Sequence, residues 1–156
     1  MPTAYLICGK ICSGKSYLAR TLAREKNAVI LSADEITTLF GADLGDQHDA
    51  VSRRVRQYLF QKAAEIIACG VSVILDWGFW SREMRGEAAA YFAARAIPTQ
   101  WHYLDIADET WQARIDHRNA HLGQADYYVD AGLKQKCLTL FEKPDRQEID
   151  VWHDIP

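Results

Sequence analysis

The stretch Gly9-Lys10-Ile11-Cys12-Ser13-Gly14-Lys15-Ser16 decides the fold of this chain, because it matches the pattern G-x-x-x-x-G-K-[ST] in full. With glycine at about 7% of residues, a chance match in a chain of this length is on the order of one in a few hundred. An apolar run at residues 5–8 comes directly before it, as a buried parallel strand does. An amphipathic pattern with Leu18 and Leu22 on one face comes directly after it. The order strand, glycine-rich turn, helix is typical of an α/β fold.

This turn has the composition of a phosphate-binding loop. Its glycines let the backbone curl so that successive N–H groups point inward, and the helix N-terminus adds partial positive charge. We expect Lys15 to reach the β- and γ-phosphates of ATP and the Ser16 hydroxyl to ligate Mg²⁺. The alternative is a glycine-rich turn with an exposed lysine. The residues expected to contact the nucleotide are Gly9, Lys10, Ile11, Cys12, Ser13, Gly14, Lys15, Ser16 and Tyr17.

The rest of the chain alternates short apolar runs with helical patterns. Further strands are indicated at residues 28–31, 71–75, 100–104 and 149–152, and helices at residues 35–40, 49–68, 81–95, 108–119 and from Leu133 to Phe141. Because parallel strands need long right-handed crossovers, this alternation predicts an α/β fold of the P-loop NTPase type. We expect a three-layer αβα sandwich of about five parallel strands. At about 100–200 residues per domain, the 156 residues make one domain, 1–156.

Composition excludes several classes of protein. The 18 Lys and Arg against 21 Asp and Glu give a formal charge of −3, whereas a general nucleic-acid coat needs a large positive surplus. No apolar run near the start approaches the roughly 20 residues that span a bilayer, and the first residues do not resemble an export signal. None of the four cysteines forms a CxxC pair, and the spacing of Cys8 and Cys12 is poor for zinc. We expect a cytoplasmic protein with free thiols and no membrane partner, either a monomer or a homodimer.

Two carboxylates stand at predicted strand ends. In parallel sheets the ligand lies beyond the carboxyl ends of the strands, so the ends at Gly9, residues 32–34 and Asp76 should converge on one cleft. Asp76 has the position of a Walker B carboxylate and can hold Mg²⁺, or it can cap the turn that follows its strand. Asp34 can orient or deprotonate an attacking hydroxyl, or it can be the N-cap of the helix at residues 35–40.

Two arginines are suited to a lid over a nucleotide. Arg114 and Arg118 are four residues apart and share one helix face beside a polar loop, so the lid is expected at about residues 114–132. Arginines there would neutralise the charge that spreads over a transferred phosphoryl group. The alternative is a solvated basic face paired with Asp108 or Glu109.

Aromatic and basic residues follow the Asp76 strand and are candidates for binding a phosphoryl acceptor. Trp77, Phe79 and Trp80 form an aromatic loop that can stack on a sugar or base, or can cover the core. Arg82 and Arg85 can hold an acceptor or its phosphate.

Taken together, these segments resemble the small P-loop kinases of the AAA-type ATP-binding protein group, which includes polynucleotide kinase, zeta toxin, gluconate kinase and chloramphenicol phosphotransferase. The resemblance extends from Tyr5 to about Phe141. The matching segments are the glycine-rich turn, Leu31-Ser32-Ala33-Asp34, Val73-Ile74-Leu75-Asp76-Trp77-Gly78-Phe79-Trp80-Ser81-Arg82-Glu83 and Ala113-Arg114-Ile115-Asp116-His117-Arg118-Asn119. It implies ATP with Mg²⁺, a nucleotide-kinase-like sheet with a helical lid, Asp34 near the acceptor hydroxyl, and Arg114 and Arg118 at the lid.

The expected activity is transfer of the γ-phosphoryl group of ATP to a hydroxyl of a small molecule such as a sugar, a nucleoside or an antibiotic. Lys15, Asp34, Arg114 and Arg118 are the expected catalytic residues. Members that act on polynucleotide ends commonly carry an Arg soon after the Asp, and here Ile36-Thr37-Thr38 stands instead. A nucleic-acid end kinase and a non-catalytic ATP-binding switch are the alternatives. A GTPase is disfavoured because the chain has no N-K-x-D guanine signature.

Overall fold

The computed structural model describes residues 1–40, 45–123 and 128–156. Within this part of the chain, five strands form one sheet in the order β2-β3-β1-β4-β5, and each hydrogen-bonded pair is parallel. The strands are β1 (Ala4–Cys8), β2 (Val29–Leu31), β3 (Val73–Gly78), β4 (Thr99–Ile106) and β5 (Val151–Ile155). The predicted five-stranded parallel sheet is confirmed.

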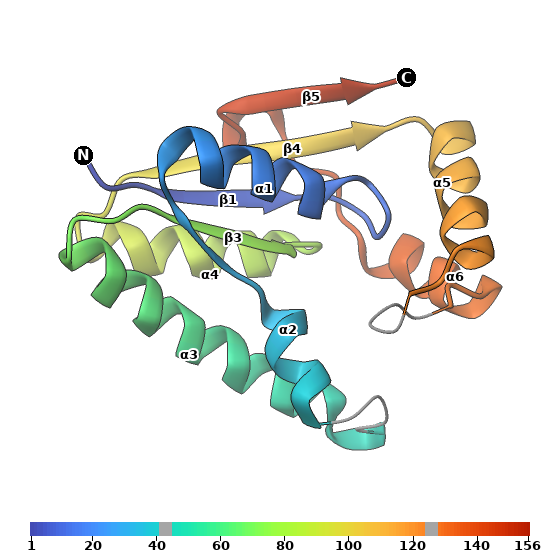
Figure 1. The fold of residues 1–156 in the computed structure, drawn as a ribbon, viewed down its shortest axis with the longest axis horizontal. Helices are drawn as coiled ribbons and strands as arrows, with labels where there is room; N and C mark the ends of the chain where they lie inside the picture. The colour runs from blue at the N-terminus through green and yellow to red at the C-terminus, as the bar shows by residue number, and fades with distance from the viewer. Residues whose placement is uncertain (41–44, 124–127) are drawn as a thin grey trace.

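Helices cover both faces of the sheet, with α1 on one face and α3 and α4 on the other (Figure 1). The helices are α1 (Lys15–Lys26), α2 (Ala33–Thr37), α3 (His48–Ala68), α4 (Arg82–Ala93), α5 (Asp108–Ala120) and α6 (Ala131–Leu140). Short 3₁₀ helices lie at Thr38–Phe40, Gly45–Gln47 and Arg146–Glu148. The α5 and α6 helices stand together beyond the end of the sheet to which the β1 arrow points (Figure 1). This is the predicted αβα sandwich.

Side chains along β1 alternate between the two helical layers. Tyr5 and Ile7 pack in one cluster with Leu22 of α1, whereas Leu6 packs in another with Phe60 of α3. Because both faces are covered, every residue of β1 is buried, and the strand reads as an uninterrupted apolar run. Burying a Leu or Ile side chain contributes about 1.5–3 kcal/mol, so β1 firmly anchors the turn that follows it.

The end of β3 differs from the prediction. The strand runs on to Gly78 instead of closing at Leu75, so Asp76 and Trp77 lie within it. Phe79 is 0% exposed and lies in the core, so for this residue the second interpretation of the aromatic loop, that it covers the core, holds and stacking on a ligand does not. The prediction ended the strand at the first polar residue. A strand whose side chains alternate between two environments can carry a polar one at its end without leaving the sheet.

Two further element boundaries differ. Ser32 is the N-cap residue of α2, and Asp34 lies inside that helix, so the N-cap interpretation of Asp34 is wrong. The fifth strand begins at Val151, two residues after the predicted start, because its pairing with β4 starts at His102. Ser81 is the N-cap of α4 as its sequence position indicates, and its hydroxyl accepts a hydrogen bond from the Met84 N–H at 3.1 Å. No helix in the described parts of the chain is long and apolar enough to cross a membrane.

Candidate active site

The turn after β1, the start of α2 and the end of β3 lie along one edge of the sheet. β3 pairs with both β2 and β1, and all three strands run in the same direction, so their carboxyl ends are neighbours. The ammonium group of Lys15 interacts electrostatically with the carboxylates of Asp76 and Asp34. These three side chains therefore surround one site, as expected from the convergence of strand ends.

The glycine-rich turn between β1 and α1 curls back on itself. Gly14 has a φ of 102° and Cys12 a φ of 56°, both in the left-handed region that favours glycine. Gly9 approaches Ser13 so closely that a Cβ on Gly9 would stand 2.6 Å from Ser13 Oγ. Within the described residues, the buried Ser13 Oγ has no hydrogen-bond partner. A tight turn that leads into a helix N-terminus and leaves a buried hydroxyl unpaired has the features of an anion site.

Lys15, the first residue of α1, extends across the inside of this turn. Its Nζ donates to the carbonyl oxygens of Lys10 at 2.7 Å and Gly9 at 3.2 Å. Burial lowers the pKa of Lys15, and the negative charges of Asp76 and Asp34 oppose that shift. The Lys15 ammonium group is thus hydrogen-bonded to carbonyl groups of the turn and interacts with two carboxylates.

Asp76 is the less exposed of the two carboxylates. Burial raises its pKa to about 6, the charge of Lys15 works against this rise, and Asp34 and Glu35 reinforce it. Asp34 lies in α2 and is exposed, as are Ser16 and Tyr17 at the start of α1. Lys15 thus interacts with one half-buried carboxylate and one exposed carboxylate.

Helix α5 is hydrogen-bonded to the turn through one of its faces. Arg114 Nη1 donates to the Ser13 carbonyl oxygen at 2.8 Å, and Arg118 Nη1 lies 3.6 Å from Cys12 Sγ. One turn before Arg114, the Trp111 indole N–H donates to the Ile11 carbonyl oxygen at 2.7 Å. Asp108, which the alternative interpretation paired with these arginines, lies 3.9 Å from Lys10 instead. The sequence analysis did not identify Trp111, although its spacing of three and seven residues from the two arginines places it on their face.

The Asn119 side chain, near the end of α5, is hydrogen-bonded to the backbone of Val129, which precedes α6. Asn119 Nδ2 donates to the Val129 carbonyl oxygen at 2.8 Å, and the Val129 N–H donates to Asn119 Oδ1 at 2.7 Å. Val129 itself is buried in the cluster that also contains Ile11 and Trp111. The expected lid at residues 114–132 includes positions 124–127, which lie outside the described residues.

The expected acceptor residues Trp77 and Arg85 make internal contacts. Arg85 is 2% exposed; its Nε donates to Glu148 Oε1 at 2.9 Å and its Nη1 to the Phe79 carbonyl oxygen at 3.0 Å. Trp77 packs against Phe60 of α3, with ring centroids 5.6 Å apart. The expectation that Arg85 holds an acceptor conflicts with this burial.

The other two acceptor candidates differ in their surroundings. The Trp80 indole N–H donates to the Gly9 carbonyl oxygen at 3.1 Å, so this ring contacts the glycine-rich turn itself. Arg82, at the first position of α4, has a side chain that is 61% exposed, and its Nη2 lies 3.4 Å from Asp145 Oδ2.

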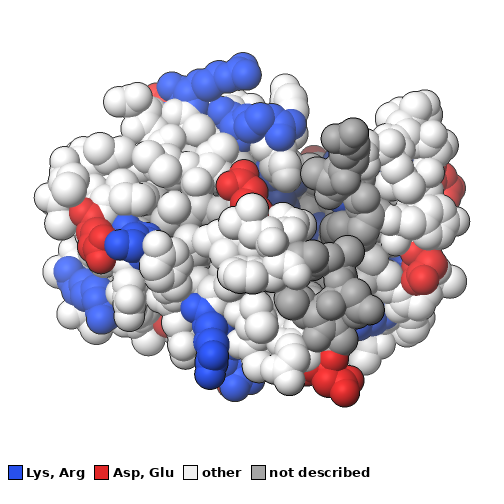
Figure 2. Space-filling model, turned by 60° about the horizontal axis from the view of Figure 1, so that its bottom comes forward, with Lys and Arg blue, Asp and Glu red and all other residues white. Residues whose placement is uncertain are grey.

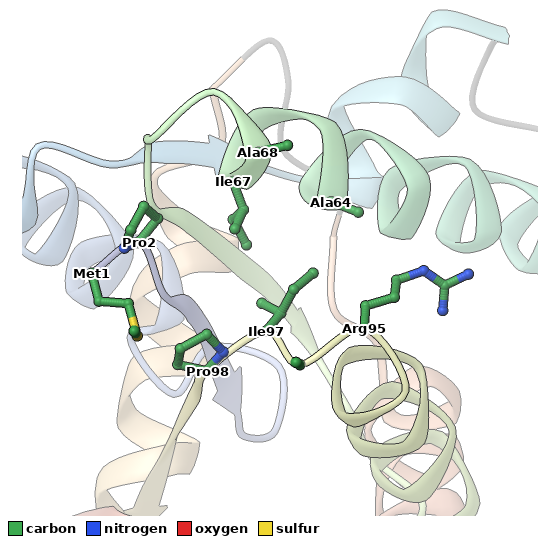
Figure 3. A pocket seen from close by; sticks show the side chains of 9 residues that line it. Met1, Pro2, Ala64, Ile67, Ala68, Arg95, Ile97 and Pro98 are labelled. Atoms are coloured by element: carbon green, nitrogen blue, oxygen red, sulfur yellow. The ribbon is translucent and has the colours of Figure 1, made fainter.

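A separate hollow lies at the opposite edge of the sheet, where the strands begin (Figure 3). Met1 and Pro2 before β1, Ile67 at the end of α3, and Ile97 and Pro98 before β4 contribute to its lining. This lining is mainly apolar. It contains no carboxylate, which a phosphoryl-transfer site would use to bind Mg²⁺.

Solved structures of kinases share this fold. A sugar kinase from Janibacter sp. HTCC2649 superposes with a TM-score of 0.69 and 21% identity, covering 99% of this chain and 86% of that one. The APS kinase CysC of Mycobacterium tuberculosis in complex with AMPPNP and APS has a TM-score of 0.71 and 19% identity, with 98% and 88% covered. A chain of the Pnkp1/Rnl/Hen1 RNA repair complex has a TM-score of 0.73 and 20% identity, with 89% and 43% covered.

No curated protein matches the chain significantly. The family profile described as "AAA domain" (AAA_33) matches residues 5–144. The match begins in β1 and includes the glycine-rich turn, both carboxylates, and the helix that carries Arg114 and Arg118. The chain therefore belongs to the AAA domain family AAA_33 and has the fold of the P-loop kinases.

Proposed function

We propose that this protein is an ATP- and Mg²⁺-dependent kinase that transfers the γ-phosphoryl group to a hydroxyl of a small molecule of the sugar, nucleoside or antibiotic type. The observation that carries the proposal is the position of Lys15, which lies inside the glycine-rich turn and interacts with both Asp76 and Asp34. A switch module needs Lys15 to bind the nucleotide and Asp76 to bind the metal. It has no use for a second, exposed carboxylate near Lys15.

The nucleotide would be held by the turn, residues 9–17. The unpaired Ser13 hydroxyl and the Gly9 position, which has no room for a Cβ, both fit an anion enclosed by backbone. Within the described residues, no three His, Cys, Asp or Glu side chains gather into a metal site. Mg²⁺ binds through few protein oxygens and through substrate phosphates, and in our proposal Ser16 and Asp76 would hold it. The ion would neutralise charge on the phosphates.

The chemical step would use groups from both sides of the cleft. In our proposal Lys15 neutralises the phosphates, Asp34 orients the acceptor hydroxyl and accepts its proton, and Arg114 and Arg118 stabilise the charge of the transferred phosphoryl group. The region 114–132 is the proposed lid that excludes water. Arg82, exposed at the start of α4, is the candidate for contact with the acceptor. Because of their internal contacts, Trp77 and Arg85 are not part of this proposal.

A nucleic-acid end kinase is the second candidate, since a structural neighbour belongs to an RNA repair complex. Two observations weigh against it. Ile36-Thr37-Thr38 stands where end kinases commonly carry an arginine. On the face in Figure 2, positive and negative side chains are interspersed, whereas a nucleic-acid track calls for clustered positive charge.

The test combines binding with a transfer screen. Titration calorimetry with ATP and Mg²⁺ should give a saturable heat that Lys15→Ala abolishes, while Arg20→Ala, an exposed change on the same helix, leaves it intact. Incubation with γ-labelled ATP and panels of sugars, nucleosides, aminoglycosides and 5′-hydroxyl oligonucleotides should label a small molecule. Labelling of oligonucleotides alone favours the second candidate. Tight ATP binding with no labelled acceptor in any panel contradicts the kinase proposal and favours a switch.

A further inference from the structure

The carbonyl oxygen of Gly9 accepts two hydrogen bonds from opposite parts of the site. Lys15 Nζ donates to it at 3.2 Å, and the indole N–H of Trp80 donates to it at 3.1 Å. Gly9 is buried, so this carbonyl group needs a partner from the protein. One of its partners is the residue that must turn towards the phosphates when a nucleotide binds.

The backbone before Trp80 is shaped for this contact. Gly78 and Phe79 have φ values of 88° and 47°, which turn the chain sharply at the end of β3. A Cβ on Gly78 would stand 2.9 Å from Trp80 Nε1 and 3.1 Å from the Gly9 carbonyl oxygen. The Gly9 N–H in turn donates to the Gly78 carbonyl oxygen at 3.0 Å. The turn after β3 therefore packs against the turn after β1, and the Trp80 indole adds a second hydrogen bond between them.

The buried Arg85 side chain is hydrogen-bonded to the backbone of Phe79 and Trp80. Its Nη1 donates to the Phe79 carbonyl oxygen at 3.0 Å and to the Trp80 carbonyl oxygen at 3.3 Å. Its Nε is bonded to Glu148 Oε1 at 2.9 Å, and only 3% of its side chain is exposed. A non-glycine residue with positive φ costs free energy, and this buried guanidinium offsets the cost by bonding the two carbonyl groups that the turn exposes.

The Trp80 ring packs inward. It contacts the cluster of buried residues that contains Ile11, Ile106 and Trp111, and the Glu142 N–H donates to its backbone carbonyl oxygen at 2.7 Å. A tryptophan that stacks on a substrate would need a free ring face. Here the N–H is bonded to the first residue of the phosphate-binding turn.

We propose that Trp80 is a positioning residue for nucleotide binding: its indole N–H keeps the Gly9 carbonyl group bonded while Lys15 leaves that group for the phosphates. Arg85 sets the position of the indole through the Phe79–Trp80 backbone. Without Trp80, turning Lys15 towards a ligand leaves a buried carbonyl group unpaired, and that cost lowers nucleotide affinity. The inference rests on the proposed binding of ATP, but not on the identity of the acceptor.

The test is Trp80→Phe, which keeps an aromatic ring and removes the N–H. Calorimetry with ATP and Mg²⁺ should show affinity about tenfold weaker than in the wild type. With an acceptor found by the screen, KM for ATP should rise while kcat and KM for the acceptor stay within about twofold. The matched control is Trp152→Phe in β5, which removes an indole hydrogen bond of 3.2 Å to Asp105 in β4 and should leave ATP affinity unchanged.

Arg85→Lys is the second variant, in case Trp80→Phe does not fold. Lysine keeps the charge beside Glu148, but its single nitrogen cannot span Glu148 and both carbonyl groups as the guanidinium does, so the same loss of ATP affinity is expected. Wild-type ATP affinity in Trp80→Phe would overturn the inference. So would a rise in KM for the acceptor alone, which would assign the ring to acceptor binding. If ATP affinity falls as expected but no acceptor is ever labelled, this inference holds and the kinase proposal fails.

Discussion

Arg114 Nη1 donates a hydrogen bond to the carbonyl oxygen of Ser13 across 2.8 Å. The same nitrogen lies 3.1 Å from the point where a Cβ on Gly14 would stand, so the two elements are in close contact there. Helix α5, in the second half of the chain, is thus hydrogen-bonded to the glycine-rich turn that follows β1. A change at Arg114 in α5 should therefore affect the conformation of the glycine-rich turn.

Replacing Arg114 with lysine should lower kcat by about 100-fold, the size of effect seen when one charge-stabilising donor is lost from a site. Lysine can still bond the Ser13 carbonyl oxygen, but it has no second, fixed donor to offer the transferred phosphoryl group. Steady-state kinetics with the acceptor identified by the screen would measure this. Arg20→Lys, on the exposed side of α1, is the matched control. A wild-type kcat for Arg114→Lys would remove Arg114 from the proposed catalytic residues.

Asp34→Asn should reduce kcat by a factor of about 10²–10⁴, the usual contribution of a general base, and leave ATP affinity within about twofold. The amide can still accept a hydrogen bond from the acceptor hydroxyl but cannot take its proton. The neighbouring exposed carboxylate provides the control, since Glu35→Gln removes a similar charge one residue away. Turnover and calorimetry should be compared for the pair. If Asp34→Asn retains full turnover, Asp34 is not the group that accepts the proton.

Asp76→Asn should make the ligand-free protein more stable at pH 7.5, although it removes a proposed Mg²⁺ ligand. The pKa of Asp76 is about 6 in the folded state against 3.8 ordinarily, so the folded protein binds this proton more tightly than the unfolded chain. Ionisation of Asp76 therefore lowers the free energy of unfolding by about 1–3 kcal/mol above pH 6. This loss shrinks as the pH falls from 6 towards 3.8 and disappears below pH 3.8.

Urea unfolding without nucleotide checks this expectation. The gain for Asp76→Asn over the wild type should be full at pH 7.5, partial at pH 5 and close to zero at the acid end. A variant that is less stable than the wild type at pH 7.5 would mean that the attraction to Lys15 outweighs the cost of burial. In the presence of Mg²⁺ and ATP the order should reverse, because only the wild type would gain stability from the bound ion.

Arg85→Ala should lower the free energy of unfolding by about 3 kcal/mol, because it breaks a buried ion pair and removes the hydrogen bonds from Arg85 to the carbonyl groups of Phe79 and Trp80. Burial alone would raise the pKa of Glu148, but hydrogen bonds from Arg85 and the Asp145 backbone hold it below its ordinary value. Arg82→Ala, three residues earlier in an exposed pair with Asp145, should cost less than 1 kcal/mol. Chemical denaturation of both variants measures the difference. Equal losses would argue against a structural role for Arg85.

Much of the site could be predicted because its signals are local. Residues 5–16 contain the strand, the turn and the helix start, and each depends on side chains within a few positions of one another: apolar runs, glycines and a lysine at fixed spacing. The convergence of Asp34 and Asp76 also followed, since parallel strands joined by helices bring their carboxyl ends to one edge. The shared face of Arg114 and Arg118 followed from helical periodicity alone.

The roles of Trp80, Arg85 and Trp111 could not be predicted in the same way. Their partners are Gly9, Glu148 and Ile11, which stand 63 to 100 residues away along the chain. An arginine or a tryptophan after a strand has the same local appearance whether it faces a ligand or the interior. Only the packing of α4, α5 and the Arg146–Glu148 turn against the sheet decides which.

The sequence by itself determined the order of strands and helices, the glycine-rich turn and the edge of the sheet at which we propose that the chemistry takes place. These properties depend on periodicity and on the short-range conformational preferences of glycine and apolar residues. The tertiary structure alone decided which polar side chains are free to meet a ligand, because a buried hydrogen bond is made between groups that only folding brings together. Arg114 reaches the turn beside Lys15, and Arg85 stays inside, for that reason.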